Sequence, residues 1–276
     1  MEQLRIDGLT PRSLHASRKS WWDGVFTRLL LDAIPLDVRQ VLEVDCGLAG
    51  AAHTLLPSLP EARYLGIDFN PERLAEAKAE LEGAPVAPRV ELRLALATGL
   101  PASDASIDLW LSVMSLQHHG DVPAVLAEAM RVLRPGGRAV AVEPDNLGQR
   151  FYFDGGLEEI SAAFHNLCLK ARVARQPSDI ALGPRLPSLL LEAGLLRTQM
   201  IPHLVAATRI ETANSYFTRL RRVAESIAGD AGLPADGDAL EGCDQAIKRC
   251  LFSGLPKRLG MSSHIVPVFI CIGHKT

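Results

Sequence analysis

The residues best suited to binding a ligand lie in the stretch VLEVDCGLAG (41–50), where an apolar run ends in a turn around Gly47. A strand, a tight turn and a helix in succession present backbone N–H groups and the positive end of the helix to a ligand. Gly47 has no Cβ, so the backbone can approach that ligand closely. Asp68 follows at about 20 residues, where an acidic residue is placed to accept hydrogen bonds from ribose hydroxyls. The pattern predicts a nucleotide-like ligand.

Two plainer interpretations stay open for these residues. The loop can be a tight turn and nothing more, because one loosely matched glycine turn is weak evidence. Asp68 can cap the helix that begins near Pro71, although Asn70 is better placed for that cap.

The elements that must position these residues alternate along the chain. The sequence predicts strands over 40–44, 62–68, 89–96, 106–114 and 138–144, and helices over 21–34, 50–58, 71–83 and 121–133. Strands separated by helices indicate a parallel, doubly wound sheet. Farther on, it predicts helices over 156–175, 185–193, 216–229 and 238–254 and strands over 196–207 and 264–274. A helical insertion between the last two strands can lie over the ligand-binding edge of such a sheet.

Four stretches resemble the ordered motifs of class I S-adenosylmethionine-dependent methyltransferases, nearest to the ubiquinone/menaquinone-type and small-molecule subgroup. These stretches are VLEVDCGLAG (41–50), YLGIDFNPERLAEAK (64–78), LPASDASIDLWLSVMSLQHH (100–119) and EAMRVLRPGGRAVAVEP (128–144). The resemblance covers residues 20–145, and RVLRPGG is its most specific element. It implies an α/β, doubly wound, seven-stranded, mostly parallel sheet with a helical insertion between the last two strands. It also implies S-adenosylmethionine as the cofactor and a small organic molecule as the methyl acceptor.

The resemblance implies cofactor contacts at three strand ends. Glu43 matches the acidic position of the first strand, and Gly47 the central glycine beside the methionine part. Asp68 matches the acid that binds the ribose. Phe69 would lie against the adenine, with ordinary packing under the second helix as the alternative. Ser115 and Leu116 would border the cofactor through their backbone groups.

The chain departs from the family pattern at three places. Asp45 replaces the first glycine, Ala49 replaces the third, and Leu96, followed by Ala97, stands where an acid often receives the adenine amino group. Asp tolerates left-handed backbone, so the turn can survive. Losing one hydrogen bond weakens binding by only about 0.5–1.5 kcal/mol. The Asp45 carboxylate would oppose the cofactor's own carboxylate unless it faces solvent or pairs. We therefore expect Asp45, Leu96 and Ala97 to border a cofactor that still binds.

Three residues are candidates for catalysis. His118 and His119 follow the fourth strand, where an acceptor should approach, and a histidine suits proton removal near neutral pH. Glu143, at the end of the fifth strand, could orient an amine or a hydroxyl. The alternatives are that the histidines are ordinary loop residues and that Glu143 is a solvated acid.

Three aromatic residues are candidates for the substrate pocket. Trp22 begins the helix before the first strand and could form a wall of the site, although core packing is an alternative. Tyr152 and Phe153 follow the fifth strand and could line the acceptor pocket. His53, His165, His203 and His264 are too dispersed to predict a metal site.

Composition limits the partners. The net charge of −3 gives no basic footprint for nucleic acid, and the chain has no apolar run near the ~20 residues that span a bilayer. The five cysteines are scattered and odd in number, which favours a reducing cytoplasm. We expect one domain with a core over 36–207 and 261–276, an N-terminal helical segment over 1–35 and a substrate lid over 208–260. A homodimer is one assembly that the sequence allows.

The leading hypothesis is therefore a methyltransferase acting on a small molecule, mainly by positioning it for in-line transfer. The alternative is a protein of the same fold that has lost the cofactor and serves as a binding module or a non-methylating enzyme. It is motivated by Asp45, Ala49 and Leu96. A nicotinamide dehydrogenase is weaker still, because the G-x-G-x-x-G fingerprint is incomplete.

Overall fold

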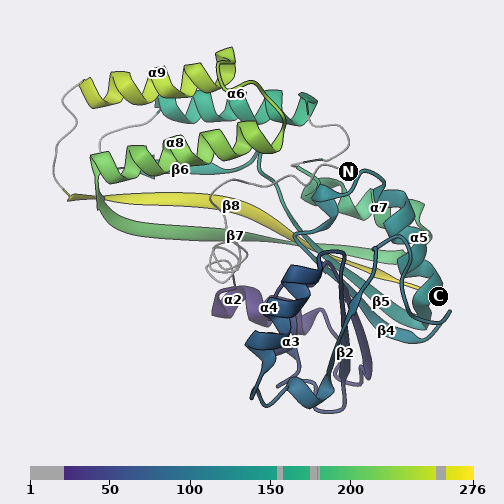
Figure 1. Cartoon of the computed structure of the whole chain (residues 1–276). Helices are drawn as coiled ribbons and strands as arrows, with labels where there is room; N and C mark the ends of the chain where they lie inside the picture. Colours follow the sequence, from purple (N-terminus) through teal and green to yellow (C-terminus); the bar gives the residue numbers. More distant parts are fainter. Residues whose placement is uncertain (1–21, 154–157, 175–178, 180, 253–258) are drawn as a thin grey trace. The chain divides into compact units, whose positions relative to one another are not determined.

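The computed structural model describes residues 22–153, 158–174, 179, 181–252 and 259–276. These residues divide into two compact units (Figure 1). The sheet unit comprises the described parts of 22–143, 182–203 and 268–276, and the helical unit those of 144–181 and 204–267. The predicted single domain and its lid boundaries stay a prediction, although the structure groups 144–181 with the insertion in one unit.

Five parallel strands form the centre of the sheet unit, as predicted. They are β1 (Gln40–Val44), β2 (Arg63–Asp68), β3 (Val90–Leu94), β4 (Ile107–Val113) and β5 (Leu133–Pro144). They pair in the order β3-β2-β1-β4-β5, and each of these four pairs is parallel. The carboxyl ends of β1, β2 and β4 therefore reach the same edge of the sheet.

Three further strands complete the eight strands found among the described residues. These are β6 (Arg150–Phe153), β7 (Leu196–Thr212) and β8 (Leu259–His274). β8 lies next to β5, and backbone hydrogen bonds join Gly136 to Lys275 and Asp145 to Pro267, so the two strands run antiparallel. β6 was not predicted as a strand and pairs antiparallel with β8. With β6, the sheet has eight strands among the described residues, one more than the seven that the resemblance implies. RFYF (150–153) was missed because its partner strand lies far along the chain.

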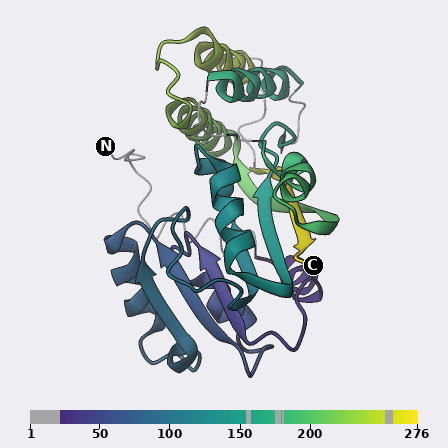
Figure 2. The same cartoon turned by 90° about the vertical axis from the view of Figure 1, so that its right-hand side faces the viewer.

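Helices cover both faces of the central strands. The sheet unit has α2 (Gly24–Asp32), α3 (Gly50–Leu55), α4 (Pro71–Leu81), α5 (Val122–Val132) and α7 (Leu186–Glu192). Leu42, Val44 and Trp110 pack in one core cluster with residues of α5 and α7. The intervening Val41 and Leu109 are buried as well, so the opposite face of the strands is also covered. Figure 2 shows the strands of this unit side by side with helices beside them.

Local signals in the sequence explain where α4 begins. Asn70 Oδ1 accepts hydrogen bonds from the backbone N–H groups of Glu72, at 2.8 Å, and of Arg73, while Pro71 is the first helical residue. The prediction that Asn70 is the cap is confirmed.

The RPGG element sets β5 against β4. Gly136 has a φ of +81°, a left-handed value that favours glycine. A Cβ at Gly137 would lie 2.9 Å from the carbonyl oxygen of Arg134 and 3.2 Å from that of Asp108. The two glycines are thus needed for different reasons, one for backbone conformation and one for close packing.

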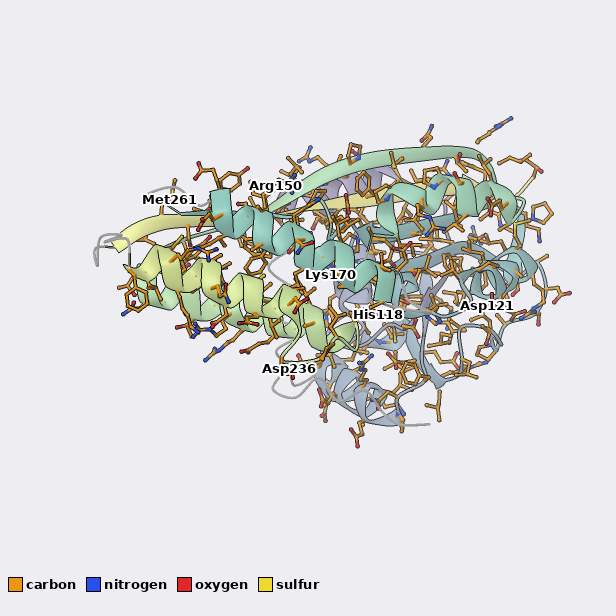
Figure 3. All side chains as sticks on the ribbon, turned by 90° about the horizontal axis from the view of Figure 1, so that it is seen from above. His118, Asp121, Arg150, Lys170, Asp236 and Met261 are labelled. Atoms are coloured by element: carbon orange, nitrogen blue, oxygen red, sulfur yellow. The ribbon has the colours of Figure 1, made fainter. Side chains whose placement is uncertain are left out.

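The helical unit contains α6 (Glu158–Ala174), α8 (Ala213–Asp230) and α9 (Asp238–Phe252). Its core holds buried side chains from these helices and from β6, namely Phe151, Ile160, Phe164, Leu167, Tyr216, Phe217, Leu220 and Ile247. Figure 3 shows Lys170 on α6, Arg150 on β6 and Met261 on β8. α8 and α9 lie between β7 and β8 in the chain, which is the predicted insertion, and α6 packs with them.

Candidate active site

The candidate site is built on the carboxyl ends of β1, β2, β4 and β5. The register places Val44 beside Ile67 of β2 and beside Ser112 of β4, so the loops that follow these strands are neighbours. The ligand-binding crevice of open α/β sheets lies at this edge.

The turn after β1 keeps a glycine-like backbone at residues that are not all glycine. Asp45 has a φ of 49°, and Gly47 and Ala49 both have a φ of 55°. Left-handed backbone costs a non-glycine residue roughly 1–2 kcal/mol. The sequence expectation that the turn survives its two substitutions is confirmed, and Ala49 is fully buried within it.

Asp68 ties the second strand to this turn. Its side chain is fully buried, Oδ2 accepts a hydrogen bond from the N–H of Gly47 at 3.0 Å, and Oδ1 accepts one from the N–H of Asn70 at 2.9 Å. The guanidinium of Arg73 lies 4.0 Å away. Burial raises the pKa of Asp68, and the two N–H groups and the Arg73 charge oppose that rise only in part. Asp68 therefore positions the turn, while Asn70 caps α4.

Asp45 pairs across the edge with the loop after β4. His119 Nε2 lies 2.6 Å from Asp45 Oδ2, and the hydroxyl of Ser115 donates to the same oxygen. Burial acts to raise the pKa of Asp45. The hydrogen bonds and charge of His119, the Ser115 hydroxyl and the charge of Arg73 outweigh it, so the pKa lies below its ordinary value. Asp45 is thus a paired, ionised carboxylate.

Glu143 holds the same loop from β5. Its Oε1 accepts hydrogen bonds from the N–H groups of Ser115, at 2.9 Å, and Leu116, at 2.7 Å, and the side chain is fully buried. Met114, just before them, has a φ of 55°. A buried carboxylate and a left-handed residue together fix the path of this loop, so Glu143 is not a solvated loop acid.

Glu43 and Trp22 line a cavity of about 300 Å³ beside the turn. Its other lining residues are Cys46, Leu48, Gly50, Ala51, His53, Thr54, Glu80 and Val113. The buried carboxylate of Glu43 accepts a hydrogen bond from the Tyr64 hydroxyl. Burial and the Glu43 charge raise the pKa of Tyr64 well above its ordinary value. Trp22 also packs edge-on against Phe26, with ring centroids 5.2 Å apart. It therefore lines the cavity and packs against the helix α2 as well.

Apolar side chains lie open to solvent at or just beyond the carboxyl ends of β2 and β3. Phe69 is 55% exposed, Leu96 is 63% exposed and Leu94 is 61% exposed. Ala97, by contrast, is buried in the core cluster that contains Leu100. Phe69 and Leu96 could accept an aromatic ring, whereas Ala97 offers its backbone only.

Three predicted residues take no part in the contacts described above. His118 is exposed at the end of the short helix Leu116–His118, near Asp121 in the chain (Figure 3). Tyr152 belongs to the helical unit and is 53% exposed. The side chain of Phe153 lies outside the described residues.

Two residues of the site and one contact between side chains were not predicted from the sequence. Tyr64 and Arg73 contact predicted acids, and Arg73 had a signal, since it lies in the first turn of a helix that starts beside Asp68. The Asp45–His119 contact had no local signal, because 74 residues separate the partners.

Comparison with known proteins fits this geometry. Residues 42–141, which run from β1 into β5, match the family model described as a methyltransferase domain. The chain carries a class I S-adenosylmethionine-dependent methyltransferase domain. Its mostly parallel sheet is the fold expected for that family.

Individual relatives of the methyltransferase domain extend this finding. A 37.1 kDa protein in transposon TN4556 of Streptomyces fradiae is 32% identical over 76% of this chain and 59% of its own length. The ubiquinone/menaquinone biosynthesis C-methyltransferase of Paracoccus denitrificans is 33% identical over 40% of this chain and 44% of its own. The chain thus spans less than two thirds of these relatives.

A solved structure shares the fold of the methyltransferase domain. Phosphoethanolamine N-methyltransferase 2 of Haemonchus contortus, in complex with phosphomonomethylethanolamine and S-adenosylhomocysteine, has a TM-score of 0.55 and 14% identity, covering 97% of this chain and 60% of that one. Within the part of the chain that the structure describes, no helix has the length and apolarity to cross a membrane.

Proposed function

We propose that this methyltransferase domain binds S-adenosylmethionine at the carboxyl edge of its sheet and transfers the methyl group to a small organic molecule. One observation carries the proposal. Asp45, Gly47 and Ala49 all keep left-handed backbone although two of them are not glycine, and the buried Asp68 holds the N–H of Gly47. Strained backbone of this kind clusters at ligand sites, which supports the assignment of the turn to the cofactor.

The residues at this edge fit the cofactor. We assign Gly47, Asp45 and Ser115 to the methionine part, and Glu43 and Trp22 to the cavity beside it. Asp68 is assigned to the ribose. The exposed side chains of Phe69 and Leu96, with the backbone of Ala97, offer an apolar surface for the adenine.

The cofactor, when bound, supplies an electrophilic methyl group on a sulfonium. The protein then has to align the acceptor with that methyl and keep water away, which is mainly a matter of position. Of the catalytic candidates, His119 is half-buried and fixed, His118 is exposed, and Glu143 holds the loop that leads from β4 to the two histidines. We assign the contact with the acceptor to His119 and a positioning role to Glu143.

A small molecule as the acceptor is supported by relatives such as the C-methyltransferase of ubiquinone and menaquinone biosynthesis. Tyr152 and Phe153 remain candidates for contact with the acceptor. The absence of nucleic acid and membrane among the partners, a cytoplasmic location and a homodimer also remain predictions.

Calorimetry with S-adenosylmethionine and S-adenosylhomocysteine tests the proposal. We expect both to bind, and Asp68→Ala to weaken the binding of each by tenfold or more. The alternative of a cofactor-free binding module predicts that neither ligand binds, even at millimolar concentration. That result would overturn the proposed function.

A further inference from the structure

The contact between Asp45 and His119 has consequences for proton transfer. Asp45 stands where the family pattern has glycine, and its carboxylate reaches the loop after β4. An ionised carboxylate can only accept hydrogen bonds, so His119 Nε2 must carry the hydrogen. In the neutral ring, the lone pair then lies on Nδ1.

The described residues around His119 engage its other nitrogen, Nε2. Among the described residues, no hydrogen bond involves Nδ1, and the side chain is 21% exposed. The backbone N–H of His119 donates to the carbonyl oxygen of Leu116 at 3.0 Å, which fixes where the ring starts. Ser115 holds the carboxylate from a second direction. One nitrogen is therefore anchored while the other can meet a ligand.

We propose that His119 is the general base for the acceptor, that Asp45 is its positioning residue, and that the acceptor is a phenolic or enolic hydroxyl. This inference rests on the proposed function and adds the acceptor class to it. The hydroxyl oxygen forms a bond to the methyl carbon, the carbon–sulfur bond breaks with its electron pair remaining on sulfur, and the O–H proton passes to Nδ1 of His119. Asp45 keeps the ring oriented and stabilises the imidazolium that results.

The need for a base selects among acceptors. A carboxylic acid is already ionised at neutral pH and gives this pair nothing to remove. An ammonium must lose its proton before its lone pair exists, so removal cannot accompany attack. A phenol, with a pKa of about 10, can release its proton as the new bond forms.

Matched variants separate orientation from folding. Asp45→Gly restores the residue that the left-handed backbone prefers, so a loss of activity in it cannot be attributed to a strained turn. His119→Gln keeps an N–H that can reach Asp45 but has no basic nitrogen. His165→Gln, on the exposed side of α6, is the control for replacing a histidine.

The activity test uses S-adenosylmethionine with phenol, which is protonated near neutral pH, and with 4-nitrophenol at a pH where it is ionised. For His119→Gln we expect kcat/KM to fall by about 100-fold with phenol but by less than about threefold with 4-nitrophenol. Asp45→Gly should lose about tenfold with phenol. His165→Gln should match the wild type with both.

A spectroscopic readout needs no acceptor. In proton–nitrogen correlation spectra of protein with isotope-labelled histidine, neutral His119 should carry its hydrogen on Nε2, and Asp45→Gly should lose that preference. A hydrogen on Nδ1 in the wild type would overturn the orienting role of Asp45.

The other outcomes are equally decisive. If His119→Gln lowers kcat/KM equally with phenol and with 4-nitrophenol, proton removal by His119 is excluded. If the wild type binds S-adenosylmethionine but methylates neither phenols nor enols, the acceptor class is wrong. Failure to bind the cofactor would instead remove the proposed function, and calorimetry reports that result separately.

Discussion

Replacing Asp68 by Asn should cost both stability and cofactor affinity. The carboxylate accepts from Gly47 N–H at 3.0 Å and from Asn70 N–H at 2.9 Å. An amide of the same size has one accepting oxygen, and its own N–H group would face one of these donors. Leaving a buried donor unsatisfied costs about 1–3 kcal/mol.

Removing the buried charge offsets part of this loss of stability. Burial raises the pKa of Asp68, which means that the ionised form is held in the fold at some expense, and the variant removes that charge. We therefore expect a net loss of about 2 kcal/mol, which corresponds to a fall in Tm of about 4–8 °C for a chain of this size. The affinity for S-adenosylmethionine should fall by about tenfold, because one charge-assisted bond to the ribose is lost.

Thermal unfolding followed by circular dichroism, and calorimetry with the cofactor, measure the two effects separately. Asp32→Asn, at the exposed end of α2, is the matched control and should change neither. A Tm within about 1 °C of the wild type would refute the positioning of the turn by Asp68. A lower Tm with unchanged affinity would refute the ribose assignment alone.

Three further predictions concern the fold around the site. Gly137→Ala should lower the Tm by several degrees because its Cβ would lie 2.9 Å from the Arg134 carbonyl oxygen. Gly99→Ala, whose Cβ would lie in open space, is the control and should leave the Tm unchanged; equal Tm values for the two variants would contradict this prediction. Ala49→Gly should change unfolding stability by less than about 1 kcal/mol, since relief of the left-handed backbone is offset by a more flexible unfolded chain and a lost buried methyl; a large gain in urea unfolding would mean that the strain is greater than argued. His264 has its pKa lowered to about 4 by burial and by the charge of Arg219, so the unfolded chain takes up a proton below about pH 6.5 that the folded chain refuses. The free energy of unfolding should therefore fall by about 3 kcal/mol from about pH 6.5 to about pH 4, and this part of the fall should be absent in His264→Gln. Urea unfolding that shows the same pH dependence in both proteins would exclude this role of His264.

Features that depend on neighbouring residues can be derived from the amino-acid sequence alone. Asn70 and Pro71 specify the start of α4 because a cap and a first helical residue act within one turn. The apolar runs and the helices between them specify parallel strands, whose carboxyl ends must share an edge. Gly47 and Asp68 could be assigned to that edge for the same reason.

Contacts between residues far apart in the chain become visible only in the folded protein. Local patterns carry no information about a partner 74 residues away, so the pairing of Asp45 with His119 could not be foreseen. β6 was missed because its pairing partner is at the other end of the chain, and α6 joins α8 and α9 through packing rather than sequence proximity. Side-chain contacts of this kind depend on which loops the sheet brings together, and that geometry pairs the Asp45 carboxylate with a histidine.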